Sequence, residues 1–167
     1  MDDFDSHLEG QLDTEEGVRF RIYDDATGLP FKRGDTLKGN LTVGAGINLM
    51  VPFDAAELKM IEAHRIDRMR ASLALYPWYK DQDEVRQVAL ADLTYNLGLG
   101  GLLNWPHFLS YIAVKDYQNA VLEIRKDRVW INQVHSARAD RIEKMILTGA
   151  WPADVAVASQ GSAPSGS

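Results

Sequence analysis

Apolar residues recur along the chain with two different periods, and the change from one to the other divides the sequence. From Arg19 to Tyr23 polar and apolar residues alternate, and from Leu41 to Ile47 every second residue is apolar. Such alternation predicts two half-buried strands. In the second strand Thr42 falls on the face opposite Leu41 and Val43, so it is expected to face a cleft if they face the core.

After residue 54 the apolar spacing is helical. Asp54 is a predicted N-cap with Glu57 in capping-box position, opening a helix that ends before Tyr76-Pro77. A short helix over 2–12 is also expected, because Phe4, Leu8 and Leu12 share one face. The other predicted helices, with their caps, are 84–97 before Gly98, 106–114, 117–126 capped by Asp116, and 137–148 capped by Ser136 and ended by Gly149.

This arrangement predicts an α+β, mainly helical protein with two lobes. The expected parts are a small helix-plus-hairpin lobe (1–53), a connecting helix (54–76), a larger helical lobe (77–151) and a Ser/Gly/Pro-rich tail (152–167). A ligand is expected in a cleft between the lobes.

Composition narrows the classes of function. Of the 167 residues 46% are apolar and 25% charged, which is typical of a globular protein. Cysteine is absent, so disulfides and thiol catalysis are excluded. No apolar run is long enough to span a membrane, and the acidic start does not resemble a secretory signal, so folding in a reducing cytoplasm without stable membrane association is expected.

The net charge of −6 is concentrated at the N-terminus. Residues 1–16 contain seven acids and no Lys or Arg, so the remainder is close to neutral. Basic residues between 125 and 144 are not interleaved with aromatics, and nucleic-acid binding is therefore not expected. The histidines lack the spacing of metal ligands, so no metal or other cofactor is expected; they are His7, His64, His107 and His135.

Two carboxylates, Glu16 and Asp25, flank the first predicted strand. Glycoside hydrolysis uses one protonated carboxyl as an acid and one carboxylate as a base or nucleophile. The strand between them spans about 20 Å when extended, so the pair meets only if the first helix folds back over the hairpin. Spacing alone does not bring them together.

The order of residues resembles the phage-type lysozymes, the muramidases of glycoside hydrolase family 24. The resemblance covers about residues 8–151 and rests on several segments in register. They are Glu16-Gly17-x-Arg19-x-x-x-Tyr23-x-Asp25-x-x-Gly28, Leu41-Thr42-Val43-Gly44-Ala45-Gly46, Arg86-Gln87-x-Ala89-Leu90, Tyr95-Asn96-Leu97-Gly98, Trp130-Ile131-Asn132-Gln133, Arg138-Ala139-x-Arg141 and Thr148-Gly149-x-Trp151.

The resemblance implies a two-lobed fold that hydrolyses the β-1,4 bond between N-acetylmuramic acid and N-acetylglucosamine. By position Glu16 matches the general acid, Asp25 the second carboxylate, and Thr42 the hydroxyl that helps hold the attacking water. Asp24 competes with Asp25 for the second role and is otherwise expected to be a solvated turn residue.

The resemblance also indicates residues that bind substrate. Tyr95, Asn96 and Trp105 map near the groove, and Arg138 is expected to clamp the region between the lobes. Gly44 is expected at a tight hairpin near the sugar chain. The Gly44-Ala45-Gly46 segment lacks the third glycine and the following helix of a nucleotide-binding loop.

The expected partner is therefore the glycan strand of peptidoglycan, cut with inversion by a monomer made in the host cytoplasm. The sequence leaves open whether a holin releases this enzyme or a virion carries it. Two alternatives remain open. A lytic transglycosylase cuts the same bond with one carboxylic acid and has no need of Asp25 and Thr42. A non-catalytic wall-binding virion protein needs neither carboxylate.

Overall fold

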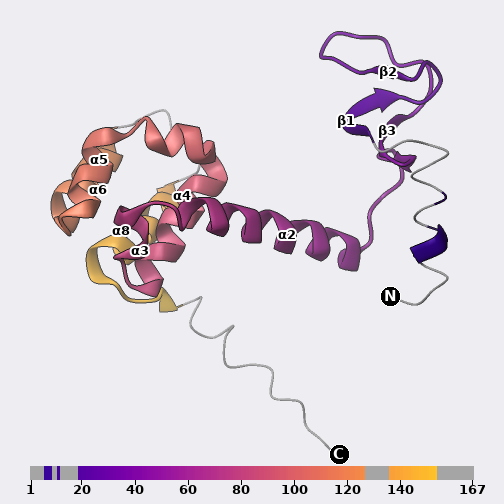
Figure 1. Ribbon diagram of the computed structural model, residues 1–167. Coiled ribbons are helices and arrows are strands. Elements are labelled where there is room, and N and C mark those ends of the chain that lie inside the picture. The colour runs from indigo at the N-terminus through magenta and orange to yellow at the C-terminus, as the bar shows by residue number, and fades with distance from the viewer. Residues whose placement is uncertain (1–5, 9–10, 12–18, 127–135, 154–167) are drawn as a thin grey trace, which may run out of the picture. The chain divides into compact units, whose positions relative to one another are not determined.

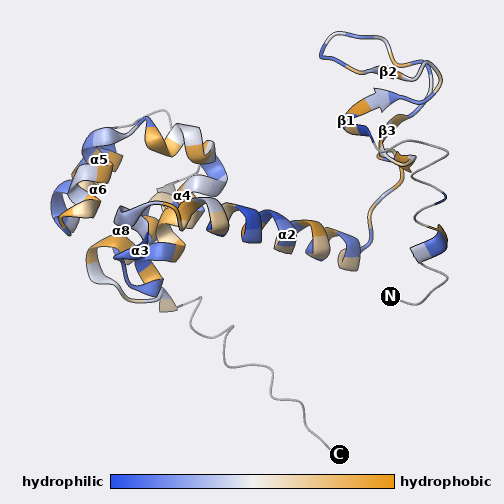
Figure 2. Cartoon of the chain, in the orientation of Figure 1, coloured by the Kyte–Doolittle hydropathy of each residue, from blue (hydrophilic) through white to orange (hydrophobic). Residues whose placement is uncertain are grey.

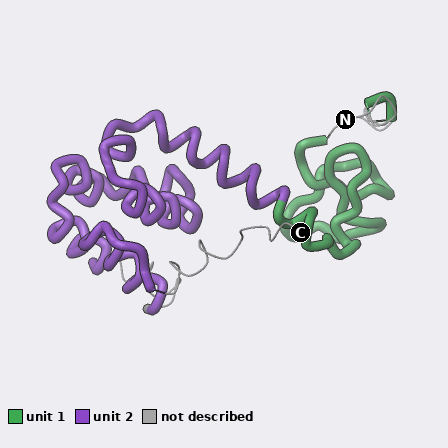
Figure 3. Tube along the Cα trace, turned by 90° about the horizontal axis from the view of Figure 1, so that it is seen from below, with its two compact units in different colours: residues 1–59 green, residues 60–167 purple. Residues whose placement is uncertain are grey.

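The computed structural model describes residues 6–8, 11, 19–126 and 136–153 (Figure 1). The chain divides into two compact units, Met1–Lys59 and Met60–Ser167 (Figure 3). Their boundary falls within a long helix, α2 (Ala55–Leu73). The structure is mainly helical with one small antiparallel sheet, which confirms the α+β prediction. The predicted domain limits at residues 53, 76 and 151 stay predictions.

The sheet of the first unit has the strand order β2-β1-β3-β4, and every neighbouring pair is antiparallel. The strands are β1 (Arg19–Asp24), β2 (Leu29–Pro30), β3 (Leu41–Gly44) and β4 (Ile47–Asn48). The long loop between β2 and β3 returns the chain to the other edge of β1, so the C-terminal end of β1 lies beside the start of β3.

The second alternating segment is a hairpin, so the prediction of one strand over 41–47 is wrong. β3 ends at Gly44 and β4 begins at Ile47. Gly44 and Gly46 have φ values of +65° and +94°, a backbone region that glycine adopts without the steric cost other residues incur. The two glycines thus turn the chain at a point where alternation alone predicts that the strand continues.

The faces of β1 also differ from expectation. Phe20 is 92% exposed and Ile22 is exposed as well, whereas Tyr23 and Asp24 at the end of the strand are buried. Among the described residues of the first unit, Tyr23 is the one buried hydrophobic side chain. Burial of apolar area therefore contributes little to this part of the molecule.

Helix α2 begins with the predicted capping box. The Oδ1 atom of Asp54 accepts hydrogen bonds from the N–H groups of Ala56 and Glu57 at 2.7 and 2.8 Å, and Glu57 Oε2 accepts from the N–H of Asp54 at 2.7 Å. Hydrophilic and hydrophobic residues mix around the helix (Figure 2), and it has one buried side chain, Leu73 in its last turn. The helix is thus stabilised mainly at its two ends.

The second unit continues with helices that enclose a hydrophobic core. They are α3 (Pro77–Lys80), α4 (Glu84–Leu103), α5 (Pro106–Ala113), α6 (Tyr117–Lys126) and α8 (Ser136–Thr148). Apart from the short α3, each was predicted from its apolar spacing. The largest fully buried side chains of the described residues are Phe108, Leu73, Leu90, Leu93, Leu102, Ile112, Ile124, Ile142 and Ile146.

The predicted helix ends are also present. Gly98 has a φ of +71° and interrupts α4, although helical structure resumes beyond it to Leu103. Asp116 caps α6 by accepting a hydrogen bond from the N–H of Asn119 at 3.2 Å. Gly149 ends α8 with a φ of +62° and donates its N–H to the carbonyl of Met145 at 2.9 Å. The predicted first helix and the tail lie largely outside the described residues; residues 6–8 are helical.

Arg86 joins two segments that are far apart in the sequence. Its Nε donates to the carbonyl of Ile146 at 2.8 Å, and its guanidinium lies 3.8 Å from the centre of the Tyr117 ring. A Cβ atom added at Gly149 would lie 2.4 Å from Arg86 Nη1. The end of α8 therefore depends on an arginine in α4 and on a glycine that leaves room for it.

Candidate functional site

The turn after β1 is organised around the buried carboxylate of Asp24. This side chain is 4% exposed, and it accepts hydrogen bonds from the backbone N–H groups of Ala26 at 3.0 Å, Lys38 at 2.7 Å and Gly39 at 2.9 Å. The expectation of a solvated turn residue is wrong. Because three backbone donors satisfy the carboxylate, its burial is compensated, and it fastens the turn to the loop before β3.

The neighbouring carboxylate, Asp25, is exposed and is held by Asn40. Its Oδ1 accepts from the backbone N–H of Asn40 at 2.6 Å, and its Oδ2 accepts from the side-chain amide of Asn40 at 2.9 Å. The backbone donor, and after it the amide donor, hold the pKa of Asp25 below its ordinary value of 3.8. Asp25 is therefore an ionised carboxylate at neutral pH, oriented by Asn40.

Gly39 makes this approach possible. A Cβ atom at this position would lie 2.1 Å from Asp25 Oδ1 and 2.7 Å from the Cβ of Ala26. Since no side chain fits there, the loop passes directly over the two acidic residues. Its backbone N–H groups can therefore reach both of them.

Thr42 belongs to the same cluster. Its hydroxyl donates to the carbonyl of Asn40 at 3.3 Å, and Thr42 lies opposite Tyr23 in the sheet. Thr42 is 3% exposed, whereas Leu41 and Val43 are only partly buried, so the predicted division of faces is wrong. Asp25 and Thr42 thus both form hydrogen bonds with the same residue, Asn40.

Sequence reasoning missed Asn40. The antiparallel pairing of Asp24 with Leu41 puts Asn40 opposite Asp25, just beyond the paired residues. An amide side chain opposite a carboxylate could have indicated the contact. The register that reveals it depends on the length of the intervening loop, which the apolar pattern does not determine.

Glu16 and Gly44 are the other two predicted site residues of the first unit, and the structure describes only Gly44. Glu16 lies outside the described residues. Gly44 ends β3, pairs with Arg19 across the sheet, and has the positive φ that opens the hairpin turn. Its predicted place at a tight hairpin is confirmed.

In the second unit two of the predicted residues, Asn96 and Arg138, bond to an acid that was not predicted, Asp92. The amide of Asn96 donates to the backbone carbonyl of Asp92 at 2.7 Å and to its Oδ1 at 3.1 Å. Arg138 from α8 forms an ion pair with the same carboxylate through Nη2. Asp92 thereby links α8 to α4 and orients both side chains.

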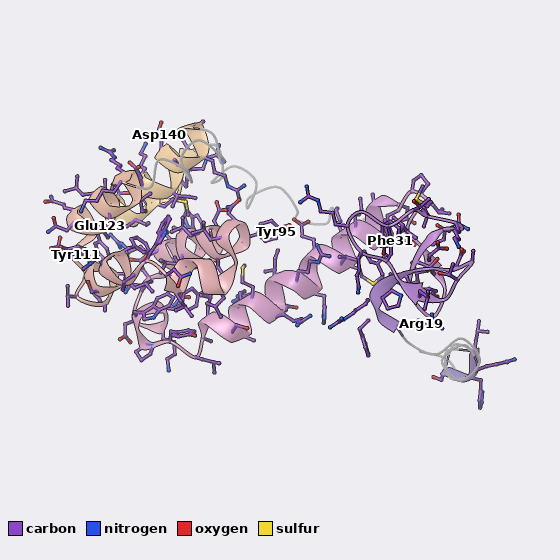
Figure 4. All side chains as sticks on the ribbon, turned by 90° about the horizontal axis from the view of Figure 1, so that it is seen from above. Arg19, Phe31, Tyr95, Tyr111, Glu123 and Asp140 are labelled. Atoms are coloured by element: carbon purple, nitrogen blue, oxygen red, sulfur yellow. The ribbon has the colours of Figure 1, made fainter. Side chains whose placement is uncertain are left out.

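The two predicted aromatic residues, Tyr95 and Trp105, differ from each other in exposure. Tyr95 is a residue of α4 and is 55% exposed at the surface (Figure 4). Trp105 precedes α5 and is half-buried, with its ring in an edge-to-face contact at 5.8 Å from Phe108. Tyr95 is therefore the more accessible of the two rings as a platform for a sugar.

Tyr95 stands between two cavities bordered by α2 and α4. One, of about 500 Å³, is also lined by Asp92 and Arg138 and contains further acidic and basic side chains. The other, of about 540 Å³, is lined on the α2 side by Arg65 and Arg68. Both cavities are large enough for a sugar-sized ligand.

Within the described ranges no group of three or more acidic or histidine side chains is arranged to hold a metal ion. No helix in that part of the chain is both long and apolar enough to cross a membrane.

Comparison with known proteins relates the chain to a phage protein. It is similar to the pre-baseplate central spike protein Gp5 of Enterobacteria phage T4, with 23% identity over 168 aligned residues. The similarity covers 83% of this chain and 27% of that protein, so the chain spans about a quarter of the length of this relative. No protein-family model matches the chain.

Proposed function

We propose that the chain is a peptidoglycan hydrolase that cleaves the β-1,4 bond between N-acetylmuramic acid and N-acetylglucosamine. The observation that carries this proposal is the Asp25 carboxylate, kept ionised by two donors of Asn40, with Thr42 bonded to the same residue. The resemblance of the sequence motifs to those of the phage-type lysozymes indicates which bond is cut. The similarity to a phage protein is consistent with this proposal.

In the proposed reaction Glu16 protonates the leaving oxygen of the glycosidic bond. Asp25 removes a proton from the attacking water, and Thr42 holds that water. Because the Thr42 hydroxyl gives its hydrogen to the carbonyl of Asn40, its oxygen is left to accept a hydrogen bond from the water. Attack from the side opposite Glu16 inverts the anomeric carbon, and the two carboxyl groups are then expected roughly 6.5–9.5 Å apart.

The lowered pKa of Asp25 fits the role of a base. A base must be deprotonated when substrate binds, while the acid Glu16 must remain protonated, so a site of this kind needs pKa values that differ. The hydrogen bonds from Asn40 lower the pKa of Asp25, which is the direction that the role of a base requires. Tyr95, Asn96, Trp105 and Arg138 are proposed to bind the glycan, together with Gly44.

The proposed biological role is degradation of the host wall during a phage cycle. The protein would act as a monomer on glycan strands in the wall, after release from the host cytoplasm through a holin. Similarity to a spike protein favours a second candidate, a virion protein that binds the wall without cutting it.

Digestion of purified peptidoglycan distinguishes these functions. Wild type should release fragments with reducing N-acetylmuramic acid ends, and NMR should show inversion at that carbon. Glu16→Gln should lower the rate by a factor of about 10²–10⁴, because general acid catalysis contributes that much. Anhydro ends would identify a transglycosylase, and wall binding without any released fragment would identify the non-catalytic protein.

A further inference from the structure

The cavity of about 540 Å³ beside Tyr95, here called the arginine pocket, differs in charge from its neighbour. Arg65, Arg68 and Ser72 line it from α2, and Tyr95 and Leu99 line it from α4 (Figure 4 labels Tyr95). No carboxylate borders it. The adjacent cavity of about 500 Å³ is lined instead by the carboxylates Glu62, Glu84 and Asp92 together with Arg70 and Arg138.

The two arginines of the arginine pocket are three residues apart on α2 and form no ion pair with another described residue. Residues three apart lie on the same face of a helix, so Arg65 and Arg68 project side by side. By contrast, Arg86, Arg125 and Arg138 each form such an ion pair. Two positive charges on one wall favour a negatively charged ligand.

The hydrogen-bonding groups of the pocket require the same kind of ligand. The hydroxyl of Ser72 donates to the carbonyl of Arg68 at 2.9 Å, and that of Thr94 donates to the carbonyl of Leu90 at 2.8 Å. The phenol of Tyr95 makes no hydrogen bond to another described residue. The unused groups are thus the donors of two guanidiniums and one phenol, which fit an acceptor with several oxygen atoms.

We propose that the arginine pocket binds an oxyanion, the shared chemistry of a carboxylate and a phosphate, and that the natural group is a carboxylate of the peptidoglycan stem peptide. Leu99 and Met69 add an apolar wall that suits the carbon chain of a peptide rather than a bare ion. The identity of the ligand rests on the proposed function, because only a wall-binding protein meets stem peptides. The preference for an oxyanion does not depend on that function.

Calorimetric titration of the full chain with the free stem tetrapeptide tests the proposal, with inorganic phosphate as the second probe. Arg65→Gln and Arg68→Gln should each weaken tetrapeptide binding about tenfold, since a charged hydrogen bond is worth that much. Arg33→Gln is the matched control, because Arg33 is exposed and lines neither cavity. The Tyr95 ring resonances should shift on binding in wild type and much less in the double variant.

Replacing both arginines by lysine keeps the positive charge, so this variant should bind the tetrapeptide more tightly than the double glutamine variant does. Such a result would show that the glutamine variants lose affinity because they lose charge and not because they misfold. Equal tetrapeptide affinity in wild type and the double glutamine variant would overturn the proposal. Arginine-dependent binding of phosphate alone would overturn the peptide assignment and identify a phosphate source. If tetrapeptide binds through both arginines but peptidoglycan is not digested, the hydrolase proposal fails and this one stands.

Discussion

All the large, fully buried side chains among the described residues belong to the unit formed by residues 60–167. In the unit formed by residues 1–59, the described side chains that are buried are Tyr23, Asp24 and Thr42, two of them polar. The helical unit is therefore held by apolar area, which is non-directional. The turn of the sheet unit is held by hydrogen bonds, which fix distance and angle.

This difference suits the roles we propose. A carboxylate that activates water must be held in one orientation, and donors at Asn40 achieve this without a large core. Hydrogen bonds of Asp24 and Asp25 go to consecutive residues of one loop, so a change at one of these residues is expected to displace the others. Loss of one contact should disturb the site, whereas the helical core should lose stability in proportion to the area removed.

The largest expected effect on stability lies in the helical core. Phe108 is 1% exposed and contacts Trp105, so Phe108→Ala should lower the free energy of unfolding by about 3–5 kcal/mol. Leu122→Ala is the matched control, because Leu122 is 53% exposed and its loss should change little. Denaturant unfolding measures both. Similar effects of the two substitutions would contradict the burial of Phe108 in the core.

Gly39→Ala should have the next largest effect. Its Cβ would lie 2.1 Å from Asp25 Oδ1, so the loop or the carboxylate must move, at a cost of about 1–3 kcal/mol and with loss of wall digestion. Gly100→Ala provides the control in the helical unit, since nothing lies within 4 Å of its added Cβ. It should be neutral or stabilising by up to about 1 kcal/mol. An unchanged wall-digestion rate in Gly39→Ala would contradict the close approach.

The hydrogen bonds of Asp25 predict a pH dependence. Its pKa is lowered in the folded chain, so these bonds stabilise the fold above about pH 4 and lose their effect as the pH falls through the folded pKa. In an NMR titration Asp25 should titrate below 3.8, and Asn40→Ala should raise that value part of the way, because the backbone donor remains.

Asn48→Ala is the control for this titration. It removes an amide whose Oδ1 accepts from the N–H of Met50 at 2.8 Å, away from Asp25. The pKa of Asp25 should not move in this variant. An Asp25 pKa that is the same in wild type and Asn40→Ala would show that the amide contributes nothing to the site.

The smallest effect is expected at the exposed face of β1. Phe20 is 92% exposed, so Phe20→Ser should change the free energy of unfolding by no more than about 0.5 kcal/mol. The comparison with Phe108→Ala then contrasts the same residue type in the two units. A loss above about 2 kcal/mol would show that another part of the protein covers this face in solution.

Much of the helical structure could be predicted from the sequence, because its signals are local. The capping box at Asp54 and Glu57, the interruption at Gly98 and the end at Gly149 each depend on a few neighbouring residues. The sheet was harder to predict. Its alternation indicated strands, but the turn at Gly44 and the exposed Phe20 depend on backbone conformation and on what covers each face.

The candidate site was predictable to the same limited extent. Asp25 was singled out as one of two carboxylates flanking a predicted strand, and Thr42 by the resemblance to the phage-type lysozymes; in the structure both hydrogen-bond to Asn40. Asn40 and the burial of Asp24 were not predictable, because both arise from the path of the loop through residues 29–40. Asp92 was missed for a similar reason, since its partner Arg138 is 46 residues away in the chain.

The central claim is that two consecutive carboxylates have different roles: Asp24 holds the turn and Asp25 performs chemistry. Measuring the initial rate of peptidoglycan digestion and the free energy of unfolding for Asp24→Asn and Asp25→Asn tests it most directly. The account predicts that Asp25→Asn loses at least a hundredfold in rate while remaining folded. It predicts that Asp24→Asn loses about 1–3 kcal/mol of stability but remains active where it is folded. An Asp25→Asn variant with more than about a tenth of the wild-type rate, beside a folded but inactive Asp24→Asn variant, would contradict the account.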